Sequence, residues 1–411
     1  RYCRIIFLQV TDGSFNIISA MTIYGAEIVK GTLTNDEYVT FGYIECGGAM
    51  ALGADAQVDG LFTLTAPAAS FTVGAHTFTF GGDIVGTNLG VFTADKTSSL
   101  IFNGTTVYEL PSNIDDLNNL TINHAGGVKM TDDLEVHGLL TLTAGDFSIY
   151  NEIESVPLEA TLTINNMTIT AGNLIGSSIS SLVVNGSTEI SLPAITLHDL
   201  QVNNDVGVEL AGDLVIFNTL DLQNGEVDNS SFGINFSTPG TGYTTHTIIR
   251  NEGSITDVPA SFGANLALQY TGAGTYSTLP EFPTGSSTTT NVTMTNGGTL
   301  TLDGDRTVNN LTLTDGTFNI DDYTLTFNGS LTGDESNNLT GGLTSSFILN
   351  GADAFAMPTG FSALNNLTVN RTNGVSIWAD LELDGILTLT SGILSLGNYH
   401  LTLKNAIAGA G

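Results

Sequence analysis

The chain has 411 residues, enough for two or three ordinary domains or for one long repeat array. Its formal net charge is −32, from 41 Asp and Glu against 9 Lys and Arg, which argues against binding to nucleic acid or anionic membranes because like charges repel. Hydrophobic residues make up 41% of the chain, charged residues only 12%, and there are 48 glycines. This composition excludes wholesale disorder and favours a core built from short strands and tight turns.

Residues 1–59 differ from the rest of the chain and contain both cysteines, Cys3 and Cys46. Apolar stretches at 15–23 and 38–44 predict short strands there. We expect an atypical N-terminal β region that caps or adapts the remainder, because a stack of strands needs a terminal unit over its exposed edge. Cys3 and Cys46 could form one disulfide that ties down this end, or could be two free buried thiols.

A repeat begins near Leu61 and occupies residues 60–411. One short block occurs four times: NLTI at 119–122, DLQV at 199–202, NVTM at 291–294 and NLTV at 366–369. A second block follows each of these: LTLTAG at 140–145, LDLQNG at 220–225, LTLTDG at 311–316 and LTLTSG at 387–392. The offset between the two blocks is nearly constant at about 20 residues, whereas the spacing between successive copies varies.

Each interval of about 20 residues holds about three short strands, as expected for one coil of a β-helix. A Ser-Ser segment opens three copies, as SSLIFNG at 98–104, SSLVVNG at 180–186 and SSFILNG at 345–351. The long copies, of about four coils each, run approximately over 99–179, 180–265, 266–343 and 344–411. In LTLT the leucines would face the interior and the threonines the solvent, with Asn and Gly at corners that need a positive φ.

We therefore predict an all-β fold, a parallel β-helix or β-solenoid, right-handed by the usual rule for parallel crossovers. The alternative is a string of β-sandwich modules of about 80 residues, which would also place strands at short intervals. The near-constant offset between the two blocks favours the solenoid, because coil length is rigid in a solenoid and insertions go to corner loops.

The stretch Asn366–Leu403, NLTVNRTNGVSIWADLELDGILTLTSGILSLGNYHLTL, resembles the repeats of long secreted surface and adhesin-like proteins of bacteria that use type IX secretion. Looser matches are Asn119–Ile149, Asp199–Val227 and Asn291–Phe327, so the resemblance extends from Leu61 onward. It implies an extracellular, cell-surface location. Such proteins usually end in a separate sorting domain, which this sequence lacks, so we expect the natural chain to have been processed or to continue.

Paired acidic residues in turns are the candidates for a metal site, because calcium is bound by several carboxylate and carbonyl oxygens. The weak calcium candidates are Asp132, Asp133, Asp303, Asp305, Asp321 and Asp322. Asp is also an ordinary turn residue, which is the alternative explanation. No other cofactor is predicted.

No catalytic residues are predicted, because the six histidines are isolated and no cluster of carboxylates and bases stands out. Thr-x-Thr pairs such as Thr141/Thr143 and Thr388/Thr390 could form a flat, ice-binding hydroxyl face, although Glu135, Asp221 and Glu382 interrupt the outward positions. Trp378, the only tryptophan, could contact a glycan, or could belong to the core or its rim.

These observations predict a non-enzymatic extracellular structural protein, either a rigid stalk or a filament subunit that assembles head-to-tail. The strand Leu401-Thr402-Leu403 is the expected assembly edge, where a second copy or further repeats would add a strand. The alternatives are an adhesin that binds glycan or another surface ligand, and an ice-binding or polysaccharide-degrading β-helix. No run of apolar residues is long enough to cross a bilayer, so no membrane span is expected.

Overall fold

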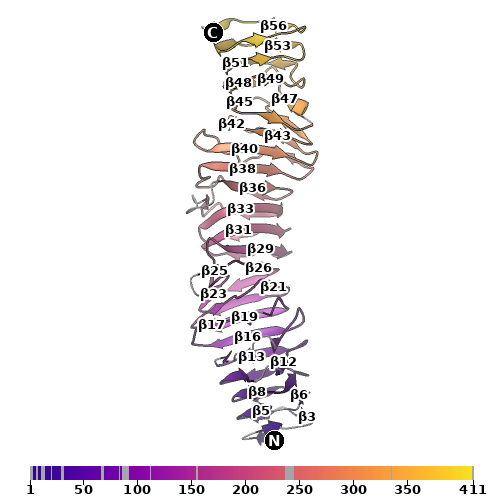
Figure 1. Ribbon diagram of the computed structural model, residues 1–411, viewed down its shortest axis with the longest axis vertical. Helices are drawn as coiled ribbons and strands as arrows, with labels where there is room; N and C mark the ends of the chain where they lie inside the picture. The colour runs from indigo at the N-terminus through magenta and orange to yellow at the C-terminus, as the bar shows by residue number, and fades with distance from the viewer. Residues whose placement is uncertain are drawn as a thin grey trace. The chain divides into compact units, whose positions relative to one another are not determined.

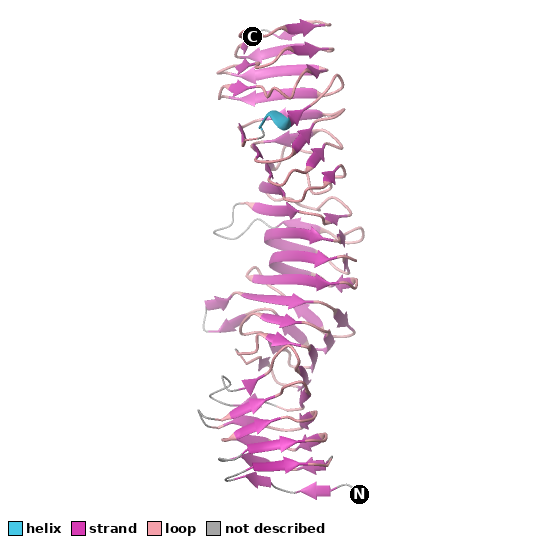
Figure 2. Ribbon diagram, turned by 90° about the vertical axis from the view of Figure 1, so that its right-hand side faces the viewer, coloured by secondary structure: helices cyan, strands magenta, loops and turns pink. Residues whose placement is uncertain are grey.

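The computed structural model describes residues 3–5, 8–10, 14–19, 21–28, 32–65, 69–82, 84–85, 92–111, 113–153, 156–236, 245–334 and 336–409. Across these ranges the chain is all-β, and its helical structure is limited to one 3-10 turn, η2 (Ser336–Asn338). Strands stack as parallel coils, which confirms the predicted β-solenoid (Figures 1 and 2). The chain divides into two compact units, Arg1–Leu214 and Val215–Gly411, described separately below.

In unit 1, consecutive strands pass in turn through three parallel sheets, so each early coil contributes one strand to each side. Sheet A contains β1 (Cys3–Ile5), β4 (Met21–Ile23), β7 (Val39–Phe41), β10 (Ala56–Val58), β13 (Thr77–Phe80), β16 (Ser99–Gly104), β19 (Asn119–His124), β22 (Leu140–Ala144) and β27 (Met167–Ile169). Sheet B contains β2 (Leu8–Val10), β5 (Ala26–Ile28), β8 (Ile44–Cys46), β11 (Phe62–Leu64) and β14 (Ile84–Val85). Sheet C contains β3 (Ser14–Ile17), β6 (Thr32–Asn35), β9 (Ala49–Ala51), β12 (Ser70–Thr72) and β15 (Phe92–Thr93).

The later coils of unit 1 use two further sheets in place of B and C. Sheet D contains β17 (Tyr108–Glu109), β20 (Val128–Lys129), β23 (Asp146–Ser148) and β28 (Asn173–Ile175). Sheet E contains β18 (Asp116–Leu117), β21 (Leu134–Val136), β26 (Ala160–Ile164), β29 (Ser180–Gly186) and β31 (Ile195–Asn204). In addition, β30 (Ile190–Leu192) pairs with β32 (Val208–Leu210), and β24 (Asn151–Ile153) forms an antiparallel hairpin with β25 (Val156–Leu158).

Unit 2 is built in the same way, from stacked parallel strands. Its first sheet contains β33 (Leu214–Asn224), β36 (His246–Arg250), β38 (Asn265–Tyr270), β40 (Thr289–Met294), β43 (Leu311–Leu313) and β46 (Leu331–Thr332), with β35 (Ile234–Phe236) paired to β33. A second contains β39 (Thr275–Tyr276), β41 (Thr299–Thr301), β44 (Thr317–Asn319) and β47 (Leu339–Thr340), and β34 (Glu226–Asp228) pairs with β37 (Ser254–Ile255).

The last coils of unit 2 use three sheets again. Sheet I contains β42 (Arg306–Val308), β45 (Thr324–Phe327), β48 (Ser346–Gly351), β51 (Asn366–Arg371), β54 (Leu387–Ser391) and β57 (Ile407–Gly409). Sheet J contains β49 (Phe355–Ala356), β52 (Val375–Ser376) and β55 (Leu394–Ser395). Sheet K contains β50 (Ala363–Leu364), β53 (Leu381–Leu383) and β56 (Leu401–Leu403).

Strand registers confirm the coil length inferred from the repeat. Leu120 pairs with Leu140, and Leu367 pairs with Leu387, so each of these coils takes about 20 residues. The alternation is also as predicted, because Leu140 and Leu142 are fully buried while Thr141 between them is half-exposed. Burying one such leucine contributes about 1.5–3 kcal/mol, so continuous stacking lets short strands build a continuous core.

The ladder of sheet A runs through residue 59, so no break in strand pairing marks the boundary predicted there. Strand β10 pairs with β7 on one side and with β13 on the other. The coils before it step by 17 or 18 residues, since Cys3 pairs with Met21, Met21 with Val39, and Val39 with Ala56, against 20 residues from Leu120 to Leu140. The described strands before residue 59 therefore stack as the later coils do, although they lack the repeated sequence blocks of the later coils.

Of the two alternatives for the cysteines, the disulfide is not formed, because Cys46 is a free, buried thiol. Its Sγ lies 3.4 Å from the carbonyl oxygen of Gly48, and burial raises the pKa of Cys46 to about 11. Strand β1 belongs to the first coil and β8 to the third, in different sheets. Two strand spacings of about 4.8 Å exceed the Cα separation that a disulfide can bridge. The side chain of Cys3 lies outside the described residues.

Two regions of the chain share one architecture strand for strand. We call residues 99–145 coil set 1 and residues 346–392 coil set 2. The strands β16 to β22 of coil set 1 correspond in order to β48 to β54 of coil set 2, and the distance along the chain between corresponding strands is constant. Both sets also shift register at the same place in their second coil, between Ile122 and Asn123 and between Val369 and Asn370. Coil set 1 lies in unit 1 and coil set 2 in unit 2.

The recurring Ser-Ser and Asn-Gly residues have structural roles in these coils. The first serine of each motif, Ser98, Ser180 or Ser345, is fully buried, and its Oγ accepts a hydrogen bond from the N–H three residues earlier. The asparagine near the end of the strand stacks on an asparagine of the next coil, with side-chain hydrogen bonds of 2.9, 3.3 and 3.0 Å in the pairs Asn103–Asn123, Asn185–Asn203 and Asn350–Asn370. These residues therefore fix the corner and the register, and need no ligand to explain them.

Candidate functional site

A cleft of about 410 Å³ lies on unit 2, across three consecutive coils. One side comes from residues 329–331 and from the start of η2, and the other from residues 353–359, which include β49. Arg371, at the end of β51, and Trp378, just after β52, come from the third coil. The cleft exists because coil corners, unlike the ladders, accept loops of different length and shape.

Trp378 is 58% exposed and lies at the rim of this cleft. Its indole N–H donates a hydrogen bond of 3.1 Å to the Oγ of Ser376, so its polar atom is satisfied and its apolar ring faces solvent. In coil set 1 the same position is held by Thr131, whose hydroxyl donates 2.7 Å to the carbonyl of Leu110. The structure thus places the tryptophan outside the core, as an outward aromatic side chain at one corner.

Arg371 forms the buried side of the cleft and is only 1% exposed. Its guanidinium donates to the carbonyl oxygens of Asp353 at 3.1 Å and Gly329 at 2.6 Å. It also lies 4.9 Å from the ring centroid of Phe355. Burial lowers the pKa of Arg371, an effect that the nearby Asp353 partly offsets. The arginine therefore joins three coils, and its charge is enclosed by carbonyls and aromatic rings.

Polar side chains complete the lining. The side chain of Asp353 is exposed, and that of Asn337 is exposed while its Oδ1 accepts a hydrogen bond of 3.1 Å from the N–H of Thr359. Ser330 and Ser336 add hydroxyl groups on the same side as Asn337. The cleft thus offers an aromatic face with several donors and acceptors, the mixture that small-ligand sites use.

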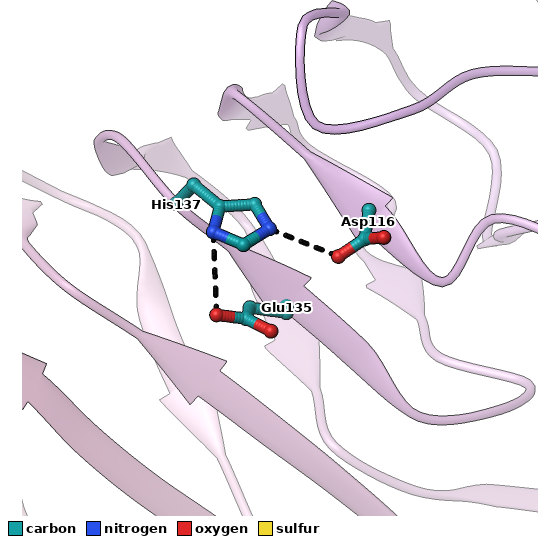
Figure 3. Close-up of side chains that lie close together, drawn as sticks. All are labelled: Asp116, Glu135 and His137. Carbon is teal, nitrogen blue, oxygen red and sulfur yellow. Dashed lines mark hydrogen bonds and ion pairs between the residues drawn. The ribbon is translucent and has the colours of Figure 1, made fainter.

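A second cluster lies on unit 1 and joins Asp116, Glu135 and His137 (Figure 3). Asp116 on β18 is the register partner of Glu135 on β21, and His137 follows directly after β21. The His137 Nε2 lies 2.9 Å from Asp116 and its Nδ1 lies 3.3 Å from Glu135. All three side chains are 33–46% exposed.

The histidine of this cluster is held between two carboxylates rather than beside an open coordination position. The Nε2 is hydrogen-bonded to Asp116 and the Nδ1 lies at ion-pair distance from Glu135, so each ring nitrogen faces a carboxylate oxygen. One nitrogen and the two carboxylates could also offer three ligand atoms to a divalent cation, since these atoms lie within 4.8 Å of one another. The half-exposed side chains and their mutual pairing explain the arrangement without a metal.

The six predicted calcium ligands serve mainly as hydrogen-bond acceptors in separate turns. Asp133 accepts the N–H of Thr161 at 2.7 Å, and Asp305 accepts that of Thr324 at 2.8 Å. Asp303 binds Arg306 and accepts the N–H of Leu279, and Asp132 accepts the N–H of Asp133. Asp321 and Asp322 form the turn before β45, and Asp321 has a φ of 55°. Within the described residues none of the six belongs to a group of three potential ligands.

The predicted assembly edge is an edge strand of its sheet. Among the described residues, β56 (Leu401–Leu403) pairs only with β53, with Leu401 and Leu403 half-buried and Thr402 exposed. The chain continues beyond it into β57, which pairs with β54. Whether another copy adds a strand here stays a prediction.

Sequence reasoning missed a buried charged group in unit 2. Glu281 is fully buried; its Oε1 lies 2.7 Å from Arg250 Nη1 and accepts a hydrogen bond of 3.0 Å from the hydroxyl of Tyr270. Burial, followed by the charge of Glu281, raises the pKa of Tyr270 well above its usual value. The only signal in the sequence is a Glu between two prolines in an otherwise apolar segment, which suggests a corner that folds inward.

Comparisons with protein families, with curated proteins and with solved structures found no match to this chain. The class is therefore defined by the fold alone, and the chain is a parallel β-solenoid repeat protein. In the part of the chain that the structure describes, no helix has the length and hydrophobicity required to cross a membrane.

Proposed function

We propose that the chain is a non-enzymatic shaft of a secreted cell-surface protein, of the kind that bacteria with type IX secretion display. The observation that supports this most directly is the uninterrupted pairing of coils inside each unit. Sheet A joins nine strands from successive coils in unit 1, and sheet I joins six in unit 2. Because the described inner coils are hydrogen-bonded to a neighbour on either side, bending one coil requires bending the coils stacked on it.

The outward surface agrees with a structural role outside the cell. Outward positions carry mainly Thr, Asn and Ser, and the net charge of −32 favours solubility and discourages association with anionic surfaces. Length in such a fold is set by the number of coils, at about 4.8 Å per coil, so a repeat array can extend a shaft without a new core.

Head-to-tail assembly into a filament has less support than the shaft itself. One of its two premises is a distinct N-terminal adapter, but the described strands β1, β4, β7 and β10 belong to the same ladder as the coils that follow. The other premise is the edge strand β56, whose pairing on one side is compatible with strand addition. The proposal therefore rests on the stacked coils and not on polymerisation.

An antibody against the purified chain tests the proposal on intact cells of the organism that encodes it. A surface shaft predicts labelling of unpermeabilised cells by immunogold electron microscopy, and loss of the label after brief protease treatment. Labelling that requires permeabilisation would place the protein inside the cell and contradict the proposal.

A further inference from the structure

The cleft beside Trp378 has the features of a binding site that a shaft alone does not need. Tryptophan normally buries most of its large apolar surface, yet the single tryptophan of this chain is 58% exposed. It borders the cleft on one side and a narrow crevice with Met357 and Pro358 on the other. The ring is therefore partly supported from beneath, while much of it stays open to solvent.

Coil set 1 shows that the fold does not require an aromatic residue at this corner. The same backbone position is occupied there by Thr131, and the neighbouring buried residues keep their character, since Tyr108, Leu110 and Pro111 correspond to Phe355, Met357 and Pro358. Both corners thus keep the same apolar support, while the outward residue differs. Trp378 is a difference on the surface and not a replacement in the core.

The polar groups around the ring restrict the ligand. The exposed carboxylate of Asp353 supplies acceptors, and the exposed amide of Asn337 and the hydroxyl of Ser336 supply donors, whereas the Ser330 hydroxyl already donates to the Oδ1 of Asn310 at 3.0 Å. Anionic ligands are disfavoured by the net charge of −32 and by Asp353 itself. Arg371 offers an anion no open contact either, because its guanidinium is 1% exposed and donates to carbonyl oxygens.

We propose that this cleft binds a neutral pyranose unit of a glycan. The apolar C–H face of the sugar would stack on the ring of Trp378, while Asp353 and Asn337 would hydrogen-bond its hydroxyl groups. A sugar satisfies both requirements at once, because it has an apolar face and a rim of hydroxyls that act as donors and acceptors. This assigns the chain a recognition role at one corner, in addition to the proposed mechanical one.

The purified full chain can test this without a label, because Trp378 is the only tryptophan and its fluorescence reports on the cleft alone. A glycan array that carries neutral, sialylated and sulfated glycans would select the probe, and titration with the best neutral oligosaccharide would follow. We expect a saturable change in tryptophan emission and protection from acrylamide quenching. The absence of any neutral binder on the array, or binding with unchanged fluorescence, would overturn the proposal.

Substitutions locate the contact. Trp378→Thr, which installs the residue that coil set 1 uses, should weaken binding about ten-fold or more by calorimetry. Asp353→Asn should weaken it less, and the control Tyr399→Thr, at an exposed aromatic residue outside the cleft lining, should leave it unchanged. Equal affinity in Trp378→Thr and the wild type, or selective binding of sialylated or sulfated glycans, would refute the assignment. Because the fluorescence test uses the wild type, the proposal stays testable even if a variant folds poorly.

Discussion

Coil sets 1 and 2 are two versions of one three-coil design, and their differences show which positions the fold fixes. The ladders agree strand for strand, and so do the register shift and the glycines Gly145 and Gly392 that follow the third coil's strand. The corners and outward positions differ. Thr131 is replaced by Trp378, and the column of Asp116, Glu135 and His137 is replaced by Ala363, Glu382 and Asp384.

The two coil sets also differ at one buried corner position, which is occupied by His124 in coil set 1 and by Arg371 in coil set 2. His124 ends β19 in coil set 1, and Arg371 ends β51 in coil set 2; both are 1% exposed. Each lies next to the Asn-Gly corner of the coil before it, where Gly104 leaves room for the His124 ring and Gly351 for the Arg371 guanidinium. The corner therefore requires a large polar side chain beside a glycine, and the two coil sets meet this requirement with different chemistry.

The largest expected effect comes from breaking that corner. Arg371→Ala should lower the free energy of unfolding by about 3–4 kcal/mol, because the carbonyls of Gly329 and Asp353 lose their donor and a cavity opens beside Phe355. Arg371→His, which borrows the residue of coil set 1, should cost less. Urea denaturation followed by circular dichroism measures both. If Arg371→Ala left the free energy of unfolding unchanged, the guanidinium would not be what stabilises the corner.

The matched glycines give the next largest effect and test whether the two coil sets respond alike. Gly392 has a φ of 82°, and an added Cβ would lie 1.7 Å from the carbonyl oxygen of Arg371; for Gly145 the values are 72° and 1.9 Å from His124. Both Gly392→Ala and Gly145→Ala should destabilise by about 2–3 kcal/mol. Gly397→Ala, with a φ of 58° but open space around it, should cost about 1 kcal/mol. Unequal losses at the two matched positions would break the comparison.

His246, another buried polar residue in unit 2, lets pH test how burial of such a residue affects stability. Burial lowers the pKa of His246, while its hydrogen bond of 3.0 Å to the carbonyl of Phe217 acts in the opposite direction. The pKa of His246 in the folded chain lies below the unfolded value of about 6.5. As the pH is lowered below 7, the unfolded chain therefore binds a proton before the folded chain does, and the free energy of unfolding falls. Thermal melts from pH 7.5 to 5.5 should show a slope that His246→Gln reduces. An unchanged slope would assign the effect to other groups.

The smallest expected effect concerns the cluster in Figure 3, which coil set 2 lacks. His137→Gln should change the free energy of unfolding by less than about 1 kcal/mol, because the three side chains are 33–46% exposed and solvent screens their charges. The change should shrink further in 1 M salt. Denaturation curves at low and high salt measure it, and a loss of several kcal/mol would mean that the cluster is a structural centre.

The sequence predicted the coil because side-chain alternation and coil length both leave a mark at fixed spacing. It did not reveal the clusters, because neighbours in space are one coil apart in the chain: Asp116 and His137 are separated by 21 residues, and nothing in the local pattern joins them. The same difficulty misplaced the acidic residues on the threonine face. Glu135 and Glu382 lie in sheets E and K, whereas Thr141 and Thr388 lie in sheets A and I, so these two carboxylates do not interrupt that face.

The cleft could be predicted only in part. Trp378 aligns with Thr131, Ala211 and Asp303 of the other copies, but the sequence left open whether it contacts a glycan or belongs to the core or its rim. The cleft beside Trp378 depends on the backbone path of residues 329–331, 336–337 and 353–359. Such loop paths depend on packing that local sequence does not determine. Arg371 was equally invisible as a cleft residue, because a lone arginine after an Asn-Leu-Thr-Val-Asn strand is usually a solvated end.

Removal of one coil tests the central claim, that coils of about 20 residues stack in register, most directly. Deletion of residues 347–366 joins Ser346 to Leu367, the register partner of Phe347, and so removes one coil while keeping the ladder of sheet I. We predict that this variant keeps the β-sheet circular dichroism and cooperative unfolding of the full chain. Deletion of only residues 347–356 puts every following strand out of register and should unfold unit 2. If the two deletions are equally tolerated, or if the in-register deletion alone unfolds the protein, the account is wrong.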